Sequence, residues 1–280
     1  MLARAKVNLY LHVVGKRADG YHLLDSLIVF AETGDDIRVA PAETLTLTID
    51  GPFGRGLDTG TGNLVMRAAL ALRELTGSKR GAAIHLTKNL PLASGIGGGS
   101  ADAAATLLAL IDLWQVTPER AALYQLAERL GADVPVCLDG RPAFVGGVGE
   151  DIVPAGTLPR MHILLVNPLV ETPTPAVFKA RRGDFSNPAR WARPPATPQD
   201  LAAYLLGRRN DLTDPAITVA PAVAAVLDAI AATPDCLLAR LSGSGATCFG
   251  LYADAARAAQ ARAAVLAGHP DWWAQEAPIS

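Results

Sequence analysis

A glycine-rich segment, Pro91–Ala101, has the residue types of a phosphate-binding loop. Its small residues let backbone N–H groups approach a polyanion closely, and the positive end of a following helix would point at the same place. Ser100 can either cap that helix or turn its hydroxyl toward a phosphate or a phosphate-bound metal. The predicted cradle consists of Pro91, Leu92, Ala93, Ser94, Gly95, Ile96, Gly97, Gly98, Gly99, Ser100 and Ala101.

The spacing of these glycines argues against two common nucleotide-binding motifs. No Lys-Ser or Lys-Thr pair follows them, as a P-loop requires, and the dinucleotide-binding GxGxxG pattern is incomplete. The alternative is an ordinary glycine-rich turn with a capping serine. Lys88, just upstream, could supply a charge for a nucleotide, or it could be a solvated strand end.

Phosphoryl transfer needs a residue that accepts the proton of the acceptor hydroxyl and a cation that screens phosphate charge. Asp133, in the run Gly131-Ala132-Asp133-Val134-Pro135, is the candidate proton acceptor. The alternative is a turn or cap residue after Gly131, because aspartate is common in such turns.

Tyr21 and His22 are rare ring-bearing residues that directly follow the turn at Asp19-Gly20. A flat base needs an aromatic face to stack on and hydrogen bonds to its edge. The alternative for His22 alone is a surface histidine. For Phe178, a third candidate, the alternative is core packing.

The elements that position these residues follow from periodicity. Apolar residues alternate with polar ones from Val7 to Val13, which predicts a half-buried strand with Lys6 and Asn8 on one face. Asn63 is a plausible N-cap, and Gly77 a plausible end, of a helix. Other expected elements are strands near 26–30, 36–39, 45–49 and 82–87, a helix that begins near Ser100, a helix over 118–130, and short strands around Gly146-Gly147 and Gly149.

A Pro- and Gly-containing stretch at 153–159 predicts a domain boundary, with domains over 1–155 and 156–280. The segment 181–199 has many prolines and arginines without a clear period, which predicts an exposed and mobile loop. The second half should be rich in βα units, with strands over 162–166, 237–241 and 247–252 and helices over 223–230 and 254–266.

Composition restricts the class of protein. Half of the 280 residues are apolar, and the formal net charge of −2 is not gathered into blocks, which argues against nucleic acid or a charged membrane surface as partner. Three cysteines without CxxC spacing suggest neither a disulfide framework nor a zinc site. No apolar run approaches the length of a membrane span, so we expect a cytoplasmic protein with a small-molecule substrate.

Three segments taken together resemble the GHMP kinase superfamily. They are Ala5-Lys6-Val7-Asn8-Leu9, the glycine-rich segment that continues through Ala104, and Leu241-Ser-Gly-Ser-Gly-Ala-Thr247. The chain departs from the family pattern at Arg4, where proline is usual, and at Ala93-Ser94, where glycines are common. The resemblance implies an α+β fold with an N-terminal domain like ribosomal protein S5 domain 2 and a C-terminal ferredoxin-like domain.

The same resemblance implies roles for individual residues. The substrates would be ATP with Mg²⁺, whose ligands stay unknown, and Lys6 and Asp133 would face one another at the acceptor oxygen. Asn63 and Lys88 would contact the nucleotide, although Asn63 is equally explained as an N-cap. The segment 242–245 would shape the cleft, or would be merely a tight turn.

Four further segments resemble the subfamily whose acceptor alcohol carries a cytidine diphosphate and belongs to non-mevalonate isoprenoid synthesis. They are Arg17–His22, Gly131–Val136, Gly146–Glu150 and Thr172–Lys179. The implied reaction forms a 2-phosphate of a methylerythritol derivative, with the acceptor bound by Asn8, Tyr21, His22, Thr174 and Phe178. Rival interpretations are another GHMP kinase, for a sugar, homoserine or mevalonate, and an inactive nucleotide-binding regulator. We expect a monomer or a weak homodimer.

Overall fold

The structure, a computed structural model, describes residues 1–279. Their helices, strands and connecting loops form two compact units. The first unit comprises Met1–Ala5, Gly34–Leu92 and Gly97–Gly140, and the second comprises Lys6–Thr33, Ala93–Ile96 and the chain from Arg141 onward. Strands β1 (Leu2–Lys16) and β2 (His22–Ala42) therefore contribute residues to both units. A boundary near residue 155 stays a proposal.

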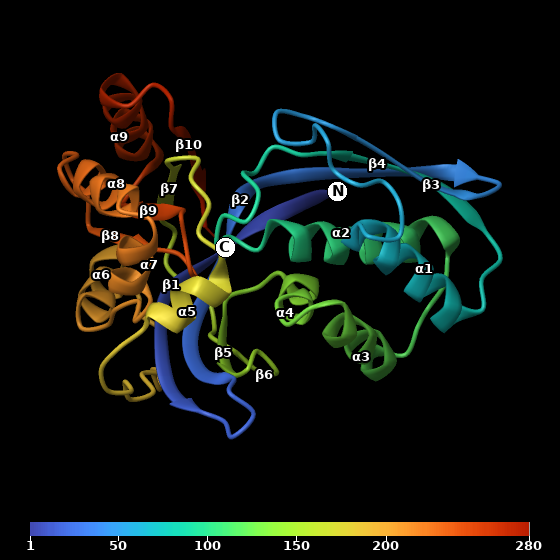
Figure 1. The fold of residues 1–280 in the computed structure, drawn as a ribbon, viewed down its shortest axis with the longest axis horizontal. Coiled ribbons are helices and arrows are strands. Elements are labelled where there is room, and N and C mark those ends of the chain that lie inside the picture. The colour runs from blue at the N-terminus through green and yellow to red at the C-terminus, as the bar shows by residue number, and fades with distance from the viewer. Residues whose placement is uncertain (280) are drawn as a thin grey trace. The chain divides into compact units, whose positions relative to one another are not determined.

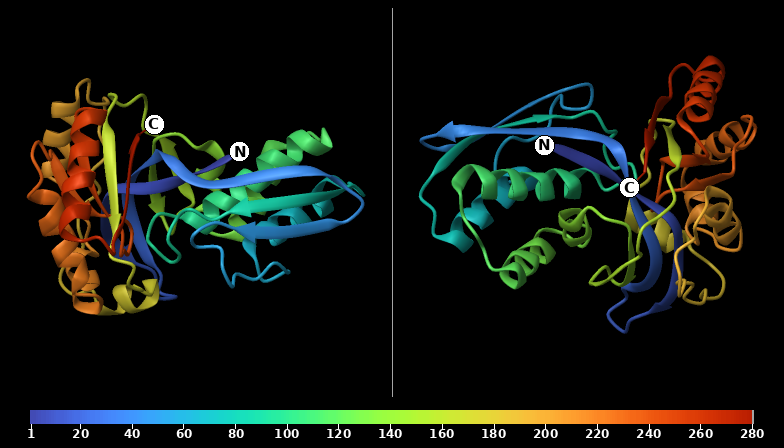
Figure 2. Two further views of the ribbon diagram at one scale, coloured as in Figure 1. Left: turned by 90° about the horizontal axis from the view of Figure 1, so that it is seen from above. Right: turned by 180° about the vertical axis from the view of Figure 1, so that it is seen from behind.

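The first unit places helices against a small sheet. In it β3 (Leu45–Asp50) pairs in parallel with β4 (Gly81–Thr87), and β4 pairs antiparallel with residues 36–42 of β2. Helices α1 (Leu64–Thr76) and α2 (Gly98–Trp114) pack together on one face of these strands (Figures 1 and 2). The shorter helices α3 (Arg120–Leu130) and α4 (Val134–Asp139) pack on α1 and α2.

The ends of the first two helices have different local causes. Asn63 caps α1 as predicted, since its side chain accepts a hydrogen bond of 2.9 Å from the Val65 N–H, and Gly77 ends α1 in a left-handed conformation. The helix expected to begin near Ser100 is confirmed as α2, with its start two residues earlier. The helix begins at Gly98, after Gly97 at the N-cap position, so that Ser100 lies in its first turn.

The second unit contains two groups of strands. Residues 24–28 of β2 pair with β5 (Ala143–Gly147), which pairs with β6 (Asp151–Pro154), and β1 pairs with β2. A separate antiparallel sheet has the order β10 (Trp273–Pro278), β7 (His162–Asn167), β9 (Cys248–Tyr252) and β8 (Leu238–Leu241).

Helices cover one face of the second sheet, as expected for a ferredoxin-like domain. Helices α8 (Ala222–Ala231) and α9 (Ala255–Gly268) lie on it (Figures 1 and 2). The core there includes Leu164, Val166, Val223, Ile230 and Tyr252. The other helices of this unit are α5 (Thr174–Ala180), α6 (Pro198–Leu206) and α7 (Thr213–Val219).

Strand β1 differs from the half-buried strand that its alternation predicts. The apolar residues Val7 and Leu9 are buried, but so is the polar row of Lys6, Asn8, Tyr10 and His12, with at most 7% of each residue exposed. The expectation is wrong because side chains of β2 and a distant segment near residue 187 hydrogen-bond to the polar row.

The segment 181–197 has neither helix nor strand within the described chain, in agreement with the predicted loop. Its predicted exposure is wrong for Ala189, Arg190 and Trp191, which are half-buried. Among residues 1–279, no helix is long and apolar enough to cross a membrane.

Candidate functional site

The three predicted motifs meet in the second unit. The Lys6 N–H donates to the Ile96 carbonyl at 2.9 Å, and the Thr247 N–H donates to the Ser94 carbonyl at 3.1 Å. The Ser242 hydroxyl joins the same place, because it accepts from the Asn8 N–H at 3.2 Å and donates to the Gly95 carbonyl at 3.1 Å. Residues 93–96 are thus fixed by β1 on one side and by the loop before β9 on the other.

Gly95 is required at this junction. Its φ is +77°, and a Cβ there would lie 2.5 Å from the Ser242 carbonyl oxygen. A side chain would therefore be strained by its backbone conformation and would collide with the third motif. The glycine allows two loops of the second unit to approach each other closely.

Lys6 and Asn8 share one face of β1, as their alternation predicted. The Lys6 ammonium donates to Asn8 Oδ1 at 3.1 Å, and both residues are almost fully buried. The Asn8 amide nitrogen donates to the Ser26 hydroxyl at 2.7 Å. The lysine that we expect to act on a phosphate is thus held by a side chain that is itself hydrogen-bonded.

The first unit holds the other half of the glycine-rich segment. Gly98, Gly99 and Ser100 form the first turn of α2, where free backbone N–H groups and the helix dipole favour an anion. A Cβ on Gly131 would lie 3.9 Å from Ser100 Oγ, so the segment that leads to Asp133 borders this turn. Asp133 directly precedes α4, a helix that the sequence analysis did not predict.

Lys88 lies in a buried ion cluster, so its interpretation as a solvated strand end is wrong. Its ammonium contacts Asp102 Oδ2 at 2.7 Å and also pairs with Asp35 Oδ2. The other Asp35 oxygen accepts from the N–H groups of Asn89 and Leu90 at 2.6 and 2.8 Å. The cluster connects Lys88, directly after β4, with Asp35 of β2 and with Asp102 near the start of α2.

The second carboxylate of this cluster is less well satisfied than the first. Asp102 Oδ1 is buried and has no hydrogen-bond partner within residues 1–279. Burial raises the pKa of Asp102 to about 7, an effect that the charge of Lys88 opposes and that of Asp35 reinforces. Asp102 therefore holds a proton in the folded protein over a pH range in which an unfolded chain has lost it.

We predict that Asp102→Asn removes a pH-dependent part of the stability. Because the native state binds more protons than the unfolded state between pH 3.8 and about 7, the wild-type free energy of unfolding should fall as pH rises through that range. The slope from this group is at most about 1.4 kcal/mol per pH unit. Urea unfolding at several pH values measures it, and the variant should lack this slope.

A matched control for this test is Asp112→Asn, on the same helix but exposed. Its stability curve should run parallel to that of the wild type. Parallel curves for Asp102→Asn and wild type would instead mean that Asp102 is ionised throughout.

The aromatic candidates lie in the second unit. The rings of His22 and Phe178 are stacked, with centroids 5.0 Å apart and planes 25° from parallel. Phe178 also packs on the core of this unit, so the packing alternative is correct for part of its surface. Tyr21 is 66% exposed, and the Thr174 hydroxyl shares a 2.7 Å hydrogen bond with that of Ser244.

The state of His22 fits a base-binding role. Burial lowers its pKa, with the positive charges of Lys16 and Arg181 adding to the effect. A neutral imidazole has one donor and one acceptor nitrogen, so His22 can offer either group to the edge of a base.

Sequence reasoning missed Asp35 and Asp102. A usable signal existed for Asp102, because a single carboxylate stands within the alanine-rich run 101–105 that starts a buried helix. Asp35 gave no such signal, since it stands beside a second acidic residue, Asp36, just before the strand predicted over 36–39.

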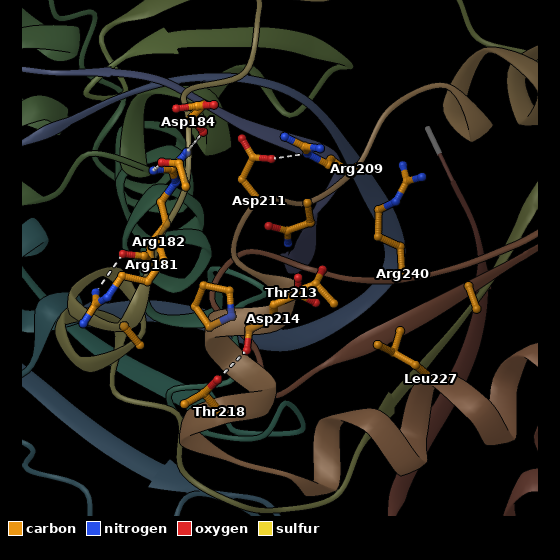
Figure 3. Close-up of a pocket in the computed structure, with 15 residues that line it drawn as sticks. Arg181, Arg182, Asp184, Arg209, Asp211, Thr213, Asp214, Thr218, Leu227 and Arg240 are labelled. Carbon is orange, nitrogen blue, oxygen red and sulfur yellow. Dashed lines mark hydrogen bonds and ion pairs between the residues drawn. The ribbon is translucent and has the colours of Figure 1, made fainter.

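A cavity of about 630 Å³ lies elsewhere in the second unit (Figure 3). Its described lining includes Arg181, Asp184, Arg209, Asp211 and Arg240, with α7 forming another part of the wall. The lining within residues 1–279 contains none of the predicted site residues, and Arg209 and Asp211 neutralise each other by an ion pair of 2.5 Å. The chemistry predicted from the sequence therefore does not belong to this cavity.

Comparison with known proteins gives the family. Residues 63–141 match the model of the GHMP kinases N terminal domain, and residues 198–271 match that of the GHMP kinases C terminal domain. A 4-diphosphocytidyl-2-C-methyl-D-erythritol kinase of Paramagnetospirillum magneticum is 57% identical over 99% of this chain and 97% of its own. One of the same name from Rhodospirillum rubrum is 50% identical over 97% of this chain and 90% of its own.

Solved structures agree with these relatives. A 4-(cytidine 5'-diphospho)-2C-methyl-D-erythritol kinase has a TM-score of 0.82 and 35% identity, and the match covers 100% of this chain and 98% of the other. A mevalonate kinase of L. major has a TM-score of 0.69 at 15% identity, over 99% of this chain and 94% of its own, which supports the fold alone. On this evidence, and with the α+β fold and the three convergent motifs, the chain belongs to the GHMP kinase family.

Proposed function

We propose that this chain is an ATP-dependent kinase that phosphorylates a hydroxyl of 4-diphosphocytidyl-2-C-methyl-D-erythritol to give its 2-phosphate, a step of non-mevalonate isoprenoid precursor biosynthesis. The observation that carries the proposal is that relatives of this name are 50–57% identical over nearly the whole chain. The mevalonate kinase quoted above is far more distant in sequence.

ATP is proposed to bind with its phosphates at the glycine-rich segment. The first turn of α2 supports this, because a Cβ on Gly99 would meet no atom within 4 Å in the described part of the chain, which leaves room for a ligand. Asn63 and Lys88 remain candidates for nucleotide contact, although Lys88 is already paired with two carboxylates.

Mg²⁺ would neutralise charge on the transferred phosphate. Residues 1–279 contain no cluster of three or more potential His, Cys, Asp or Glu ligands. We therefore propose that Mg²⁺ is held mainly by the substrate phosphates and by few protein groups, which is the usual arrangement in kinases. The hydroxyl of Ser100, in the first turn of α2, is the proposed protein ligand.

The reaction itself needs few protein groups. Asp133 is proposed to accept the proton of the acceptor hydroxyl, and Lys6 to balance charge as the phosphoryl group moves. The cytidine is proposed to stack on Tyr21 and to meet His22 and Phe178, whose mutual stacking supports a preformed aromatic surface. Asn8 and Thr174 would add polar contacts.

The wider setting of the protein is also part of the proposal. We place the protein in the cytoplasm, as a monomer or weak homodimer that binds neither nucleic acid nor membrane. Domains over 1–155 and 156–280 are proposed as its two evolutionary parts.

One assay tests the proposed function. Pure protein is incubated with magnesium-ATP and, separately, with the cytidine diphosphate of methylerythritol, mevalonate, homoserine or galactose, and ADP release is measured. We expect turnover with the cytidine compound alone. Turnover of another acceptor would identify a different GHMP kinase. No ADP release with any of the four acceptors would favour a nucleotide-binding regulator.

A variant of the loop tests where ATP binds. Gly99→Val should weaken ATP binding by about tenfold or more, because a branched side chain would occupy the space that the phosphates need. Nucleotide titration of the folded variant measures this. Gly98 is a poorer test, since its Cβ would lie 3.2 Å from Lys88 Nζ and would disturb the ion cluster. Unchanged affinity in Gly99→Val would mean that the nucleotide binds elsewhere.

A further inference from the structure

A chain of buried hydrogen bonds in the second unit runs from Lys6 away from the loops already described. Asn8 donates its amide N–H to Ser26 Oγ at 2.7 Å, and Ser26 Oγ donates to the Tyr10 carbonyl at 2.6 Å. Ser26 is 2% exposed. Its single hydroxyl proton is committed to a carbonyl, so the oxygen faces Asn8 only as an acceptor.

This commitment sets the orientation of the Asn8 amide. An amide side chain can in principle be turned by 180°, which exchanges its donor and acceptor ends. Because Ser26 offers an acceptor, the Asn8 NH₂ group must point to it, and Asn8 Oδ1 must point to the Lys6 ammonium, 3.1 Å away. The Lys6 ammonium, which can only donate, favours the same orientation, so without the Ser26 hydroxyl the contact with Lys6 alone would hold the amide.

A second branch holds the far end of the same polar row. The Tyr10 hydroxyl donates to Asp25 Oδ2 at 2.9 Å, and Asp25 is 1% exposed. Burial and the Asp25 charge raise the pKa of Tyr10, so that it keeps its proton as the donor. The other Asp25 oxygen accepts from Arg190 Nε at 2.7 Å.

Asp25 thereby ties a distant segment, residues 186–191, to β1 and β2. The Ala189 N–H donates to Asp25 at 2.8 Å, and Arg190 continues to Asp151 at 2.8 Å. The segment also covers β1 directly, through a 2.9 Å bond from the Ser186 N–H to the Val13 carbonyl and a 2.8 Å contact of the Asn187 carbonyl with His12.

Trp191 completes the attachment of this segment. Its ring makes edge contacts with Phe144 and Tyr204, each at a centroid distance of 4.9 Å, and its N–H donates to the Ala155 carbonyl at 3.0 Å. Segment 186–191 is therefore held by charge, backbone bonds and aromatic packing, and it covers a polar strand face that would otherwise meet water.

We propose that Ser26 is a positioning residue for Lys6, acting through Asn8, and that Asp25 and Arg190 support it by fixing segment 186–191 over the same strand. Asp25 and Ser26 lie on β2, which begins at His22, directly after Tyr21. The strand that begins with a proposed base-binding residue therefore also orients the lysine proposed to act on the phosphate. The proposal rests on the proposed kinase function.

The first test compares Ser26→Ala with Ser26→Thr. We expect the alanine variant to lower kcat about tenfold with the KM for ATP within twofold of wild type, because the lysine is misoriented while ATP still binds at the glycine-rich segment. The threonine variant keeps the hydroxyl and should retain kcat within about threefold. Wild-type kcat in Ser26→Ala would overturn the proposal, as would an equal loss of kcat in both variants.

The second test uses Arg190→Met with Arg257→Met as control, since Arg257 pairs with exposed carboxylates elsewhere in this unit. Arg190→Met should lower kcat by about threefold and increase amide hydrogen exchange in segment 186–191, whereas the control should change neither. Increased exchange without any change of kcat would separate the segment from Lys6 and overturn its supporting role.

A readout without turnover separates this inference from the kinase proposal. The ¹⁵N signal of the Lys6 ammonium, assigned with Lys6→Arg, reports its hydrogen bond in wild type and in Ser26→Ala. If the wild type phosphorylates none of the acceptors, the kinase proposal fails, and this signal still decides the positioning. A shifted or broadened signal in Ser26→Ala supports it, and an unchanged one overturns it.

Discussion

Asp133→Asn should lower kcat by about 10²-fold or more while ATP binding and the melting temperature change little. An amide has nearly the shape of a carboxylate but cannot accept the proton of the acceptor hydroxyl. Asp133 stands in a turn and at the N-cap position of α4, as the alternative predicted, but within the described chain its carboxylate accepts no capping hydrogen bond from the backbone N–H groups of α4. Steady-state kinetics with the cytidine substrate measures the effect.

Asp139→Asn is the matched control, because Asp139 lies in α4 itself and contacts Tyr124 and Arg120 near the surface. It should keep kcat close to that of the wild type. Near wild-type kcat in Asp133→Asn would remove this residue from the mechanism. A large fall in both variants would point to damage of α4 rather than to lost proton transfer.

Local sequence patterns predicted the structure correctly where neighbouring residues alone decide the backbone conformation. The alternation around Lys6 and Asn8 predicted a strand and a shared face, because side chains of a strand point to opposite sides in turn. Asn63 and Gly77 predicted both ends of α1. The Asn63 side chain accepts a hydrogen bond from a free N–H of the first turn, and Gly77 adopts the left-handed conformation that ends the helix.

Nonlocal contacts explain what the sequence could not predict. Lys88 looked like a solvated residue, but Asp35 and Asp102 reach it from 53 and 14 positions away. Segment 186–191 has no period of its own, and partners such as Asp25, which lies 165 positions from Arg190, hold it in place. Helix α4 has only six residues, too few for a period to emerge.

The glycine-rich segment shows both cases within a few residues. Its composition predicted close backbone approach, and Gly95 confirms this through its contact with Ser242. The same composition led us to expect the start of α2 near Ser100, two residues late, because glycine is a poor helix former and Ser100 is the better cap. The helix nevertheless begins at Gly98, where the Lys88 cluster lies beside it.

Tyr21→Ala should weaken the cytidine substrate selectively. Loss of one stacking face should cost about 1–3 kcal/mol, or roughly 5- to 150-fold in kcat/KM for the acceptor, with the KM for ATP little changed. Tyr21 is 66% exposed, which disfavours a packing role, since a packing residue would be buried. Two KM values and a thermal melt for each variant measure the effect.

Tyr21→Phe and Phe185→Ala are the controls for this prediction. The first keeps the ring and loses the hydroxyl alone, so it should be mild. The second removes another exposed ring of the same unit, which packs under Arg181 instead of standing beside His22, and it should leave both KM values unchanged. If Tyr21→Ala lowered the melting temperature by several degrees and affected ATP and acceptor alike, Tyr21 would be a packing residue. The proposed cytidine surface would then lose its exposed face, because the remaining rings of His22 and Phe178 already stack on each other.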